Sequence, residues 1–199
     1  FYCAVMTKQL ALECQILESD RLFVNGLLHD IGHLFMYIAI PEESQDTILK
    51  AKKMGRPLYQ VERELLGFDY AKLGGYVMGK WDLPKSLQAI TRFHPEPGKA
   101  DQFESETALL HLASLLVKAD LEDADFGAGA FLVDPAAWQL TGLTEEQCLQ
   151  VQHTAAEQFG EVQARLGALV ETELGPLERS MEAAGAPWTP GRVPRWNSE

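Results

Sequence analysis

The chain has 199 residues, enough for one domain of ordinary size with its own hydrophobic core. Its hydrophobic fraction of 46% and charged fraction of 23% are typical of a globular protein and exclude a disordered chain. Acidic residues outnumber basic residues by 29 to 17, which gives a formal net charge of −12. This charge disfavours nonspecific binding to nucleic acid or to an anionic membrane, because both attract basic surfaces.

The chain contains three cysteines, Cys3, Cys14 and Cys148. They are far apart and odd in number, so we expect structural thiols in a reduced, cytoplasmic protein and not a disulfide framework. No signal peptide is expected at the start, since Lys8 and Glu13 interrupt its apolar residues. The chain begins with Phe1 inside a helical pattern, and we therefore expect a fragment or a processed chain.

The first two thirds of the chain predict a series of helices separated by proline, glycine and capping residues. Asp69 is the expected N-cap of one of them, and Pro84 begins the next. We expect helices over Phe1–Leu17, Leu22–Ile40, Glu42–Met54, Pro57–Gly67, Asp69–Trp81, Pro84–His94 and Ser105–Ala119.

Three glycines, Gly74, Gly75 and Gly79, lie inside the expected helix Asp69–Trp81. Each costs a helix about 1 kcal/mol relative to alanine, so we expect them to permit close packing against another helix. The apolar face of this helix is expected to be Leu73, Val77 and Trp81. Trp81 should then be largely buried in a packed corner with Leu83 and Pro84, and Trp81→Ala should cost about 3–5 kcal/mol.

The last third of the chain predicts a loop over Leu121–Leu143, with at most a short helix near Ala136–Leu140. Thr144-Glu-Glu-Gln147 is a capping box, and the long helix behind it carries an apolar seam that stops at Gly175. We expect one helical domain over 1–175 and a Pro/Gly-rich tail over 176–199. No strand pattern is present, so the fold class is all-α.

The stretch Leu22–Ile40, LFVNGLLHDIGHLFMYIAI, is the most apolar in the chain. Its length alone would allow a membrane span, but an aspartate at a helix centre costs roughly 2.5–3.5 kcal/mol on insertion scales. We therefore expect one helix buried in a helical bundle, apolar nearly all round. Its polar residues His29 and Asp30 then need partners in the core.

A metal ion is one partner for these side chains, and neighbouring protein groups are the alternative. Adjacent His29 and Asp30 point about 100° apart on a helix, so other helices would have to supply further ligands. Without such ligands, Asp30 would brace a neighbouring helix and His29 would be a satisfied core histidine. His33 lies at i,i+4 from His29, a spacing that can chelate zinc. No Glu general base follows, so we expect His33 to bond a neighbouring backbone group instead.

The segments GLLHDIGHL, ERELLGFDYAKLGGYVMGKWDLP, AITRFHPEP and LLHLASLL occur in this order between about Val5 and Lys118. Together they resemble the HDOD domain of bacterial signalling proteins, a relative of the HD phosphohydrolases and HD-GYP phosphodiesterases. The resemblance implies an HD-like helical bundle. The full domain of that family also has a helical half upstream, so this chain would be its C-terminal half followed by a long C-terminal helix.

The resemblance also implies where metal-bearing relatives would hold an ion. The corresponding positions here read Tyr2 or Cys3, His29, Asp30, Tyr70, His94, Pro95 and Ser114. His29, Asp30 and His94 are the remaining good ligands, so a working two-metal centre is not expected. We expect Asp30 to pair with His94, Arg92 or backbone N–H groups, and Asp30→Ala to cost about 3–5 kcal/mol. His111 is expected in the core and His153 on the surface.

The function that the resemblance favours is a regulatory, non-catalytic signal-transduction domain that acts by protein interaction or ligand sensing. Its ligand-binding residues would be His29, Asp30, His33 and His94, with no cofactor, and its partner a signalling protein or a fused domain. The alternative is a phosphohydrolase or phosphodiesterase that uses a divalent metal ion on a nucleotide or cyclic dinucleotide. A third expectation is a homodimer built on the helix after Thr144.

Overall fold

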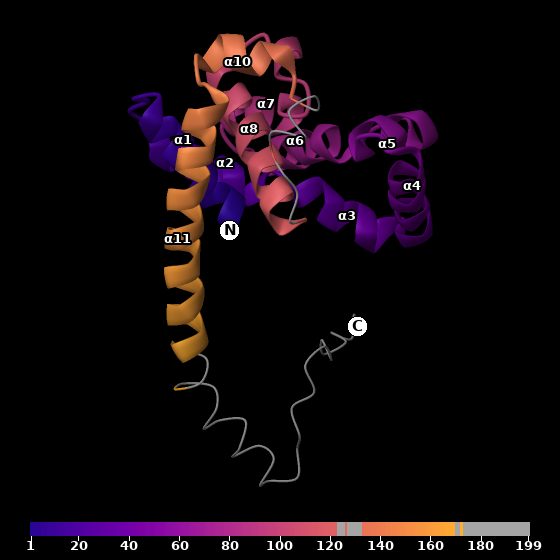
Figure 1. The fold of residues 1–199 in the computed structure, drawn as a ribbon. Coiled ribbons are helices and arrows are strands. Elements are labelled where there is room, and N and C mark those ends of the chain that lie inside the picture. Colours follow the sequence, from indigo (N-terminus) through magenta and orange to yellow (C-terminus); the bar gives the residue numbers. More distant parts are fainter. Residues whose placement is uncertain (123–125, 127–132, 170–171, 173–199) are drawn as a thin grey trace, which may run out of the picture. The chain divides into compact units, whose positions relative to one another are not determined.

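The computed structural model describes residues 1–122, 126, 133–169 and 172, which fall into two compact units, Phe1–Glu157 and Gln158–Glu199. Every regular element among the described residues is a helix, which confirms the all-α prediction (Figure 1). The helices are α1 (Tyr2–Glu13), α2 (Ser19–Leu28), α3 (Ile31–Ala39), α4 (Pro41–Met54), α5 (Leu58–Leu66), α6 (Tyr70–Lys80), α7 (Lys85–Phe93), α8 (Glu104–Leu121), α10 (Pro135–Thr141) and α11 (Glu145–Leu169), with a 3-10 turn at Pro97–Lys99.

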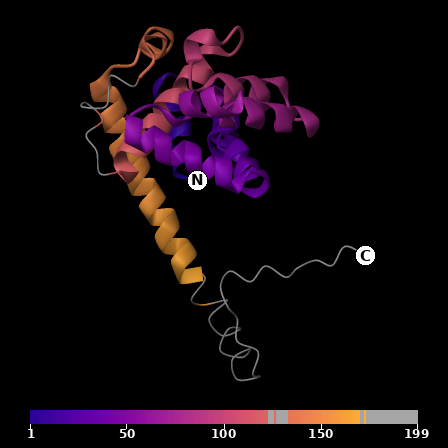
Figure 2. The ribbon, with the colours of Figure 1, turned by 90° about the vertical axis from the view of Figure 1, so that its right-hand side faces the viewer.

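The core of the first unit is built around α8. This helix packs against α1, α2, α7 and α10, and its residues from Thr107 to Ala113 are all buried. Leu109, Leu112 and Leu116 have no exposed surface. The middle of α8 is therefore buried among its neighbouring helices, and Figure 2 shows the same ribbon from a second direction.

The stretch Leu22–Ile40 does not form the single helix that we expected. Helix α2 ends at Leu28 and α3 begins at Ile31, so the His29-Asp30 pair lies at the junction between them. The break follows from packing on two different neighbours, since α2 lies on α1 and α3 lies on α6. The prediction that α3 is buried on most sides is also wrong, because only Gly32 and Met36 of this helix are buried.

Two glycines on either side of the junction permit these contacts. A Cβ atom on Gly26 would lie 2.6 Å from the Cα atom of Ala4 in α1. A Cβ atom on Gly32 would overlap the backbone carbonyl of Tyr70 in α6. The backbones of α2 and α3 therefore approach their neighbours more closely than any other residue type would allow.

The stretch Ser19–Ala39 is the one part of the described chain that is long and apolar enough, by length and composition, to cross a membrane. Its two halves are separate helices joined at the polar pair His29-Asp30. Helix α2 contacts α1, α7 and α8, and α3 contacts α4 and α6. Both halves therefore belong to the helical packing of the first unit, although most residues of α3 are not buried.

Most helix boundaries agree with the capping signals in the sequence. The Asp69 carboxylate accepts the Lys72 N–H at 2.7 Å, and Gly67 ends α5 with φ of +80°. In the capping box, the Thr144 N–H donates to Gln147 Oε1 at 3.0 Å and the Gln147 N–H donates to Thr144 Oγ1 at 3.2 Å. The first helix is shorter than expected: it stops at Glu13, and Gln15 adopts φ of +56°.

Two of the three glycines of α6, Gly74 and Gly75, lie on its buried face, whereas Gly79 is exposed. A Cβ atom on Gly75 would lie 2.9 Å from the Cβ atom of Arg92 in α7, which confirms the close packing that the sequence predicts. The predicted apolar face of α6 is wrong by about one residue. The buried residues are Ala71, Gly74, Gly75 and Met78, and Trp81 is 53% exposed. The chain does turn at Pro84, the residue before α7, but Trp81 lies on the outside of that corner.

The short helix expected near Ala136–Leu140 is α10, capped by the Asp134 carboxylate. In the first unit, α11 buries Cys148, Val151 and Ala155, the beginning of the predicted seam. In the second unit, the seam residues Leu166 and Leu169 are each 56% exposed. The expected helix end at Gly175, the domain boundary at 175 and the tail 176–199 lie outside the described residues.

Candidate functional site

The HD pair lies in a group of polar side chains contributed by several helices of the first unit. We call this group the polar centre. It consists of His29 and Asp30 at the α2–α3 junction, His33 on α3, Glu62 on α5, Tyr70 on α6 and His94 at the end of α7. The structure therefore brings together all four sequence-predicted ligand-binding residues, His29, Asp30, His33 and His94, and adds Glu62 and Tyr70.

His94 is fully buried and engaged at both ring nitrogens. Its Nδ1–H donates to the carbonyl of Thr91 at 2.7 Å, and its Nε2 accepts the hydroxyl of Tyr70 at 2.9 Å. Burial and the neighbouring charge of His29 lower the pKa of His94 to about 3. His94 is therefore neutral, and its Nε2 lone pair is already occupied by the Tyr70 hydroxyl.

His29 lies edge-on to His94, with the two ring centroids 5.4 Å apart. Its Nδ1–H donates to the carbonyl of Gly26 at 2.9 Å, which leaves Nε2 facing Cys3 and Asp30. Burial lowers the pKa of His29, but the side chains of Cys3 and Asp30 outweigh this effect and raise it to about 9. His29 is therefore the cationic histidine of the pair, and His94 is the neutral one.

His33 bridges two carboxylates. Its Nδ1 lies 3.0 Å from Asp30 Oδ1, and its Nε2 lies 3.0 Å from Glu62 Oε1. Its ring stacks on that of Tyr70 at a centroid distance of 3.9 Å. Burial lowers the pKa of His33, but the two carboxylates raise it to about 9, so the bridge is an ion pair on both sides. The expectation that His33 bonds a neighbouring backbone group is wrong.

Asp30 and Glu62 differ in exposure although both face His33. Glu62 has 1% of its side chain exposed, and its second oxygen accepts the backbone N–H of Tyr70 at 3.0 Å. Asp30 has 59% exposed, and its pKa falls to about 2 because the hydrogen bond from His33 and the charges of His29 and His33 outweigh burial. Asp30 thus pairs with His33, and not with His94 or Arg92 as the sequence suggested.

Glu62 was not among the predicted site residues, although the sequence carries a signal for it. It lies on the inner side of the short helix α5, beside the buried Val61. An acidic residue on the apolar face of a short amphipathic helix needs a partner, and His33 supplies it. The next residue, Arg63, faces a second acidic pair and donates to both Asp69 and Glu96.

The remaining histidines behave as expected. His111 is 4% exposed, donates from Nδ1 to the carbonyl of His94 at 2.8 Å and accepts the N–H of Asp134 at 3.0 Å. His153 has 77% of its side chain exposed. Ser114, at the position where relatives carry a late aspartate, donates its hydroxyl to the carbonyl of His111 within the same helix at 2.8 Å.

The donor atoms of the polar centre do not fit a metal ion. Within the described part of the chain, no three His, Cys, Asp or Glu side chains are placed to share one. Of the three predicted ligands, His94 is engaged by Tyr70 and Asp30 by His33, while His29 Nε2 lies 4.0 Å from the Asp30 carboxylate. A zinc-type centre needs at least three ligands around one point, and here the donors bond one another.

Comparison with known proteins agrees with this architecture. The family model of the HDOD domain matches residues 1–97. A candidate phosphohydrolase from Shewanella amazonensis SB2B shares 24% sequence identity at a TM-score of 0.62, over 80% of this chain and 58% of that one. An HDOD domain protein with unknown function from Geobacter sulfurreducens shares 16% identity at a TM-score of 0.60, over 85% of this chain and 59% of that one.

The chain thus spans less than three fifths of either solved structure, and at these identities the likeness shows the fold. No curated protein sequence matches the chain. The family match covers the helices from α1 to α7, which contribute every residue of the polar centre. Residues 1–97 of this chain therefore match the HDOD domain family, and the chain shares the helical fold of the two solved structures.

Proposed function

We propose that this chain is a regulatory, non-catalytic HDOD domain that acts in signal transduction by binding a protein or a small ligand. The observation that carries the proposal is the closed hydrogen bonding of the polar centre. The Tyr70 hydroxyl donates to Nε2 of His94, and the His33 ring bridges the carboxylates of Asp30 and the buried Glu62. Side chains that satisfy one another in this way stabilise a fold and leave few free donors for chemistry.

The proposed setting is cytoplasmic, and the proposed partner is a signalling protein or a domain fused to this one. The net charge of −12 supports a protein or small-ligand partner over nucleic acid or a membrane. The exposed Leu166 and Leu169 of α11 support a second copy of the chain as a further partner. If this segment holds a dimer together, deletion of residues 158–199 should leave a monomer of the shortened chain, as measured by the solution mass.

The alternative function is a metal-dependent phosphohydrolase or phosphodiesterase acting on a nucleotide or cyclic dinucleotide. Its support is that His29, Asp30 and His94 do come together in the first unit, as the HD motif requires. In that case a metal ion would have to displace the Tyr70 hydroxyl from His94 and His33 from Asp30.

The test is metal analysis combined with phosphodiesterase and phosphatase assays, with manganese, iron, zinc and nickel supplied. We expect substoichiometric metal and no turnover. The variant Tyr70→Phe frees His94 Nε2 and should leave both results unchanged, with Tyr76→Phe as the matched control at an exposed tyrosine. Stoichiometric metal, with turnover that Asp30→Ala abolishes while the helical fold survives, would establish the hydrolase instead.

A further inference from the structure

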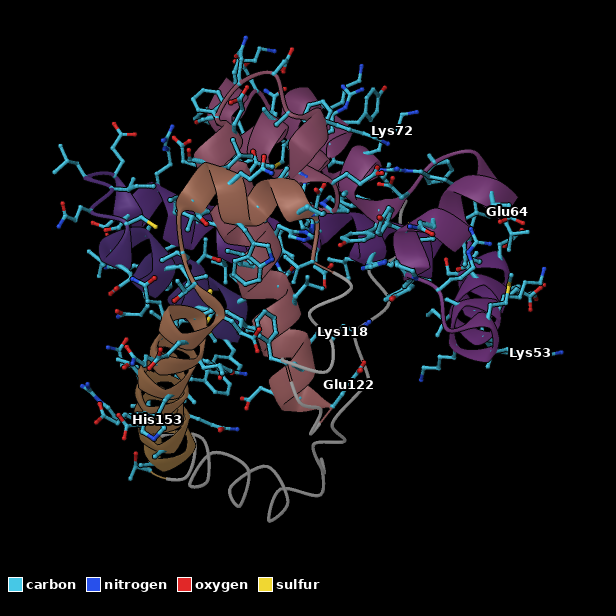
Figure 3. All side chains as sticks on the ribbon, turned by 45° about the horizontal axis from the view of Figure 1, so that its top comes forward. Lys53, Glu64, Lys72, Lys118, Glu122 and His153 are labelled. Atoms are coloured by element: carbon cyan, nitrogen blue, oxygen red, sulfur yellow. The ribbon has the colours of Figure 1, made fainter. Side chains whose placement is uncertain are left out.

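An open groove of about 680 Å³ lies along the outer sides of α6 and α7. This volume falls in the range of small-molecule sites, roughly 300–1,000 Å³. Lys72, labelled in Figure 3, belongs to its α6 side. The polar and aromatic residues that line it are Lys72, Tyr76 and Lys80 on α6, Lys85, Gln88, Arg92 and Phe93 on α7, and Asp101 and Gln102 before α8.

The groove is strongly basic in a strongly acidic protein. Four cationic side chains line it, namely those of Lys72, Lys80, Lys85 and Arg92, against the single carboxylate of Asp101. The local charge is therefore +3, whereas the whole chain carries −12. Charges of one sign gathered along a hollow repel one another and concentrate counter-ions there.

None of these four cations forms an ion pair with any residue that the structure describes. Other basic residues of the first unit do find carboxylates: Arg56 pairs with Glu64, and Arg63 pairs with Asp69 and Glu96. The chain has 29 acidic residues, yet none of the described ones forms an ion pair with these four cations, so their charge is open to an external anion.

The groove also presents aromatic rings beside the cations. The Lys80 ammonium lies 5.3 Å from the centroid of the Tyr76 ring, and that ring is 62% exposed. The Arg92 guanidinium lies 5.3 Å from the centroid of the Phe93 ring. A guanidinium fork suits phosphate oxygens, and an exposed aromatic face suits stacking by a planar base.

We propose that the α6–α7 groove binds a phosphorylated small molecule with an aromatic base, that is, a nucleotide. The proposal rests on the ligand-sensing role proposed above and names the class of ligand and its site. The cations would hold the phosphate groups, and Tyr76 would stack on the base. An open groove of this volume with aromatic rings beside its cations favours such a ligand over an acidic peptide, which would follow a longer basic track.

The site shares its two helices with the polar centre. Tyr70 and His94 lie at the inner side of α6 and α7, whereas Lys72 and Arg92 lie at the outer side. The helices are in close contact between these faces, since Gly74 and Gly75 of α6 pack against Thr91 and Arg92 of α7. A ligand in the groove would therefore contact the same packed helix pair that carries the Tyr70–His94 hydrogen bond.

Isothermal titration calorimetry with ATP, inorganic pyrophosphate and adenosine on the full chain tests the proposal. We expect ATP to bind more tightly than pyrophosphate, adenosine to bind most weakly, and the ATP affinity to fall as salt is raised from 50 to 300 mM, because the contacts are exposed charges. Lys80→Gln combined with Lys85→Gln should weaken ATP binding about tenfold. Tyr76→Ala should remove the preference for ATP over pyrophosphate.

The matched control is Lys52→Gln combined with Lys53→Gln, which removes the same charge from exposed lysines at the end of α4. This variant should bind ATP within twofold of the parent chain. Absence of ATP and pyrophosphate binding, or an equal loss in the control, would overturn the site, as would binding of an acidic glutamate peptide alone. Equal affinity for ATP and pyrophosphate would overturn the nucleotide assignment. Metal-dependent turnover would instead overturn the non-catalytic role and leave these binding results intact.

Discussion

The polar centre and the α6–α7 groove use the same two helices in opposite ways. In the polar centre each charged or polar group has a protein partner, as in the His33 bridge between Asp30 and Glu62. In the groove, Lys72, Lys80, Lys85 and Arg92 are grouped with one carboxylate, that of Asp101. Satisfied groups in a core contribute to stability, whereas unpaired charges at a hollow surface favour an external ligand.

The comparison favours the groove over the HD pair as the place where an external ligand would bind. The HD residues are retained, but their donor atoms serve the fold. Substitutions in the polar centre and its supporting contacts should therefore change the free energy of unfolding. Substitutions in the groove should leave that free energy nearly unchanged and alter binding.

The largest effect is expected at the contact that brings α3 onto α6. In Gly32→Ala the new Cβ atom overlaps the backbone carbonyl of Tyr70, so the two helices must move apart. We expect the free energy of unfolding, measured by urea denaturation, to fall by about 3 kcal/mol or more. Gly160→Ala, with no atom within 4 Å of the new Cβ, is the control and should stabilise by up to about 1 kcal/mol. An equal response of both variants would contradict the close approach.

The two carboxylates beside His33 should respond differently to removal. Glu62→Ala leaves the imidazolium and the Tyr70 N–H without their buried partner and should destabilise by about 3 kcal/mol. Asp30→Ala removes a side chain that is 59% exposed, so water replaces the carboxylate and the cost should be about 1 kcal/mol. A larger loss for Asp30→Ala than for Glu62→Ala would reverse the assignment of the buried carboxylate.

The polar centre should also make stability depend on pH. The pKa of His33 is raised to about 9 in the folded chain, so its contribution is fully present below its ordinary value of 6.5 and is lost as pH rises towards 9. His29 adds to the same loss, since its pKa is also raised to about 9. The free energy of unfolding should therefore decline between pH 6.5 and 9.

Urea titrations at four pH values in that window measure this slope. His33→Gln should reduce it, and His153→Gln, at an exposed histidine of α11, is the control that should leave it unchanged. On the acid side, the buried neutral His94, with its pKa lowered to about 3, should make stability fall as pH drops below 6.5. A flat profile between pH 6.5 and 9 would show that His33 is neutral.

A smaller effect is expected at Trp81, which follows α6 beside the groove residue Lys80. The ring is 53% exposed and meets Phe35 at a centroid distance of 5.9 Å. Trp81→Ala should cost about 1 kcal/mol, the value of one aromatic contact, instead of the 3–5 kcal/mol expected for a buried ring. Thermal unfolding followed by circular dichroism measures this, and a loss above about 3 kcal/mol would place Trp81 in a core.

The smallest effect is expected for the groove itself. Lys80→Gln combined with Lys85→Gln should change the free energy of unfolding by less than about 0.5 kcal/mol, because neither lysine forms an ion pair with a described residue and the contact of Lys80 with Tyr76 is exposed. A loss comparable to that of Glu62→Ala would mean that these lysines serve the fold and would remove the contrast between the two regions.

The sequence by itself determined the helical class, the family resemblance and most helix boundaries. These features depend on residues close together in the chain. Asp69 caps its own helix through the Lys72 N–H, and Thr144 and Gln147 close the capping box within one turn. Gly74 and Gly75 of α6 likewise predicted a close contact with another helix, which the structure identifies as α7.

Only the tertiary structure decided what surrounds the HD pair. The break between α2 and α3 lies where the chain passes from α1 to α6 as its packing neighbour, and these neighbours are distant in the sequence. The partners of His33 and His94 come from 29 and 24 residues away, Glu62 on α5 and Tyr70 on α6. Local periodicity sets which residues form a helix, but the distances between helices set which donor meets which acceptor.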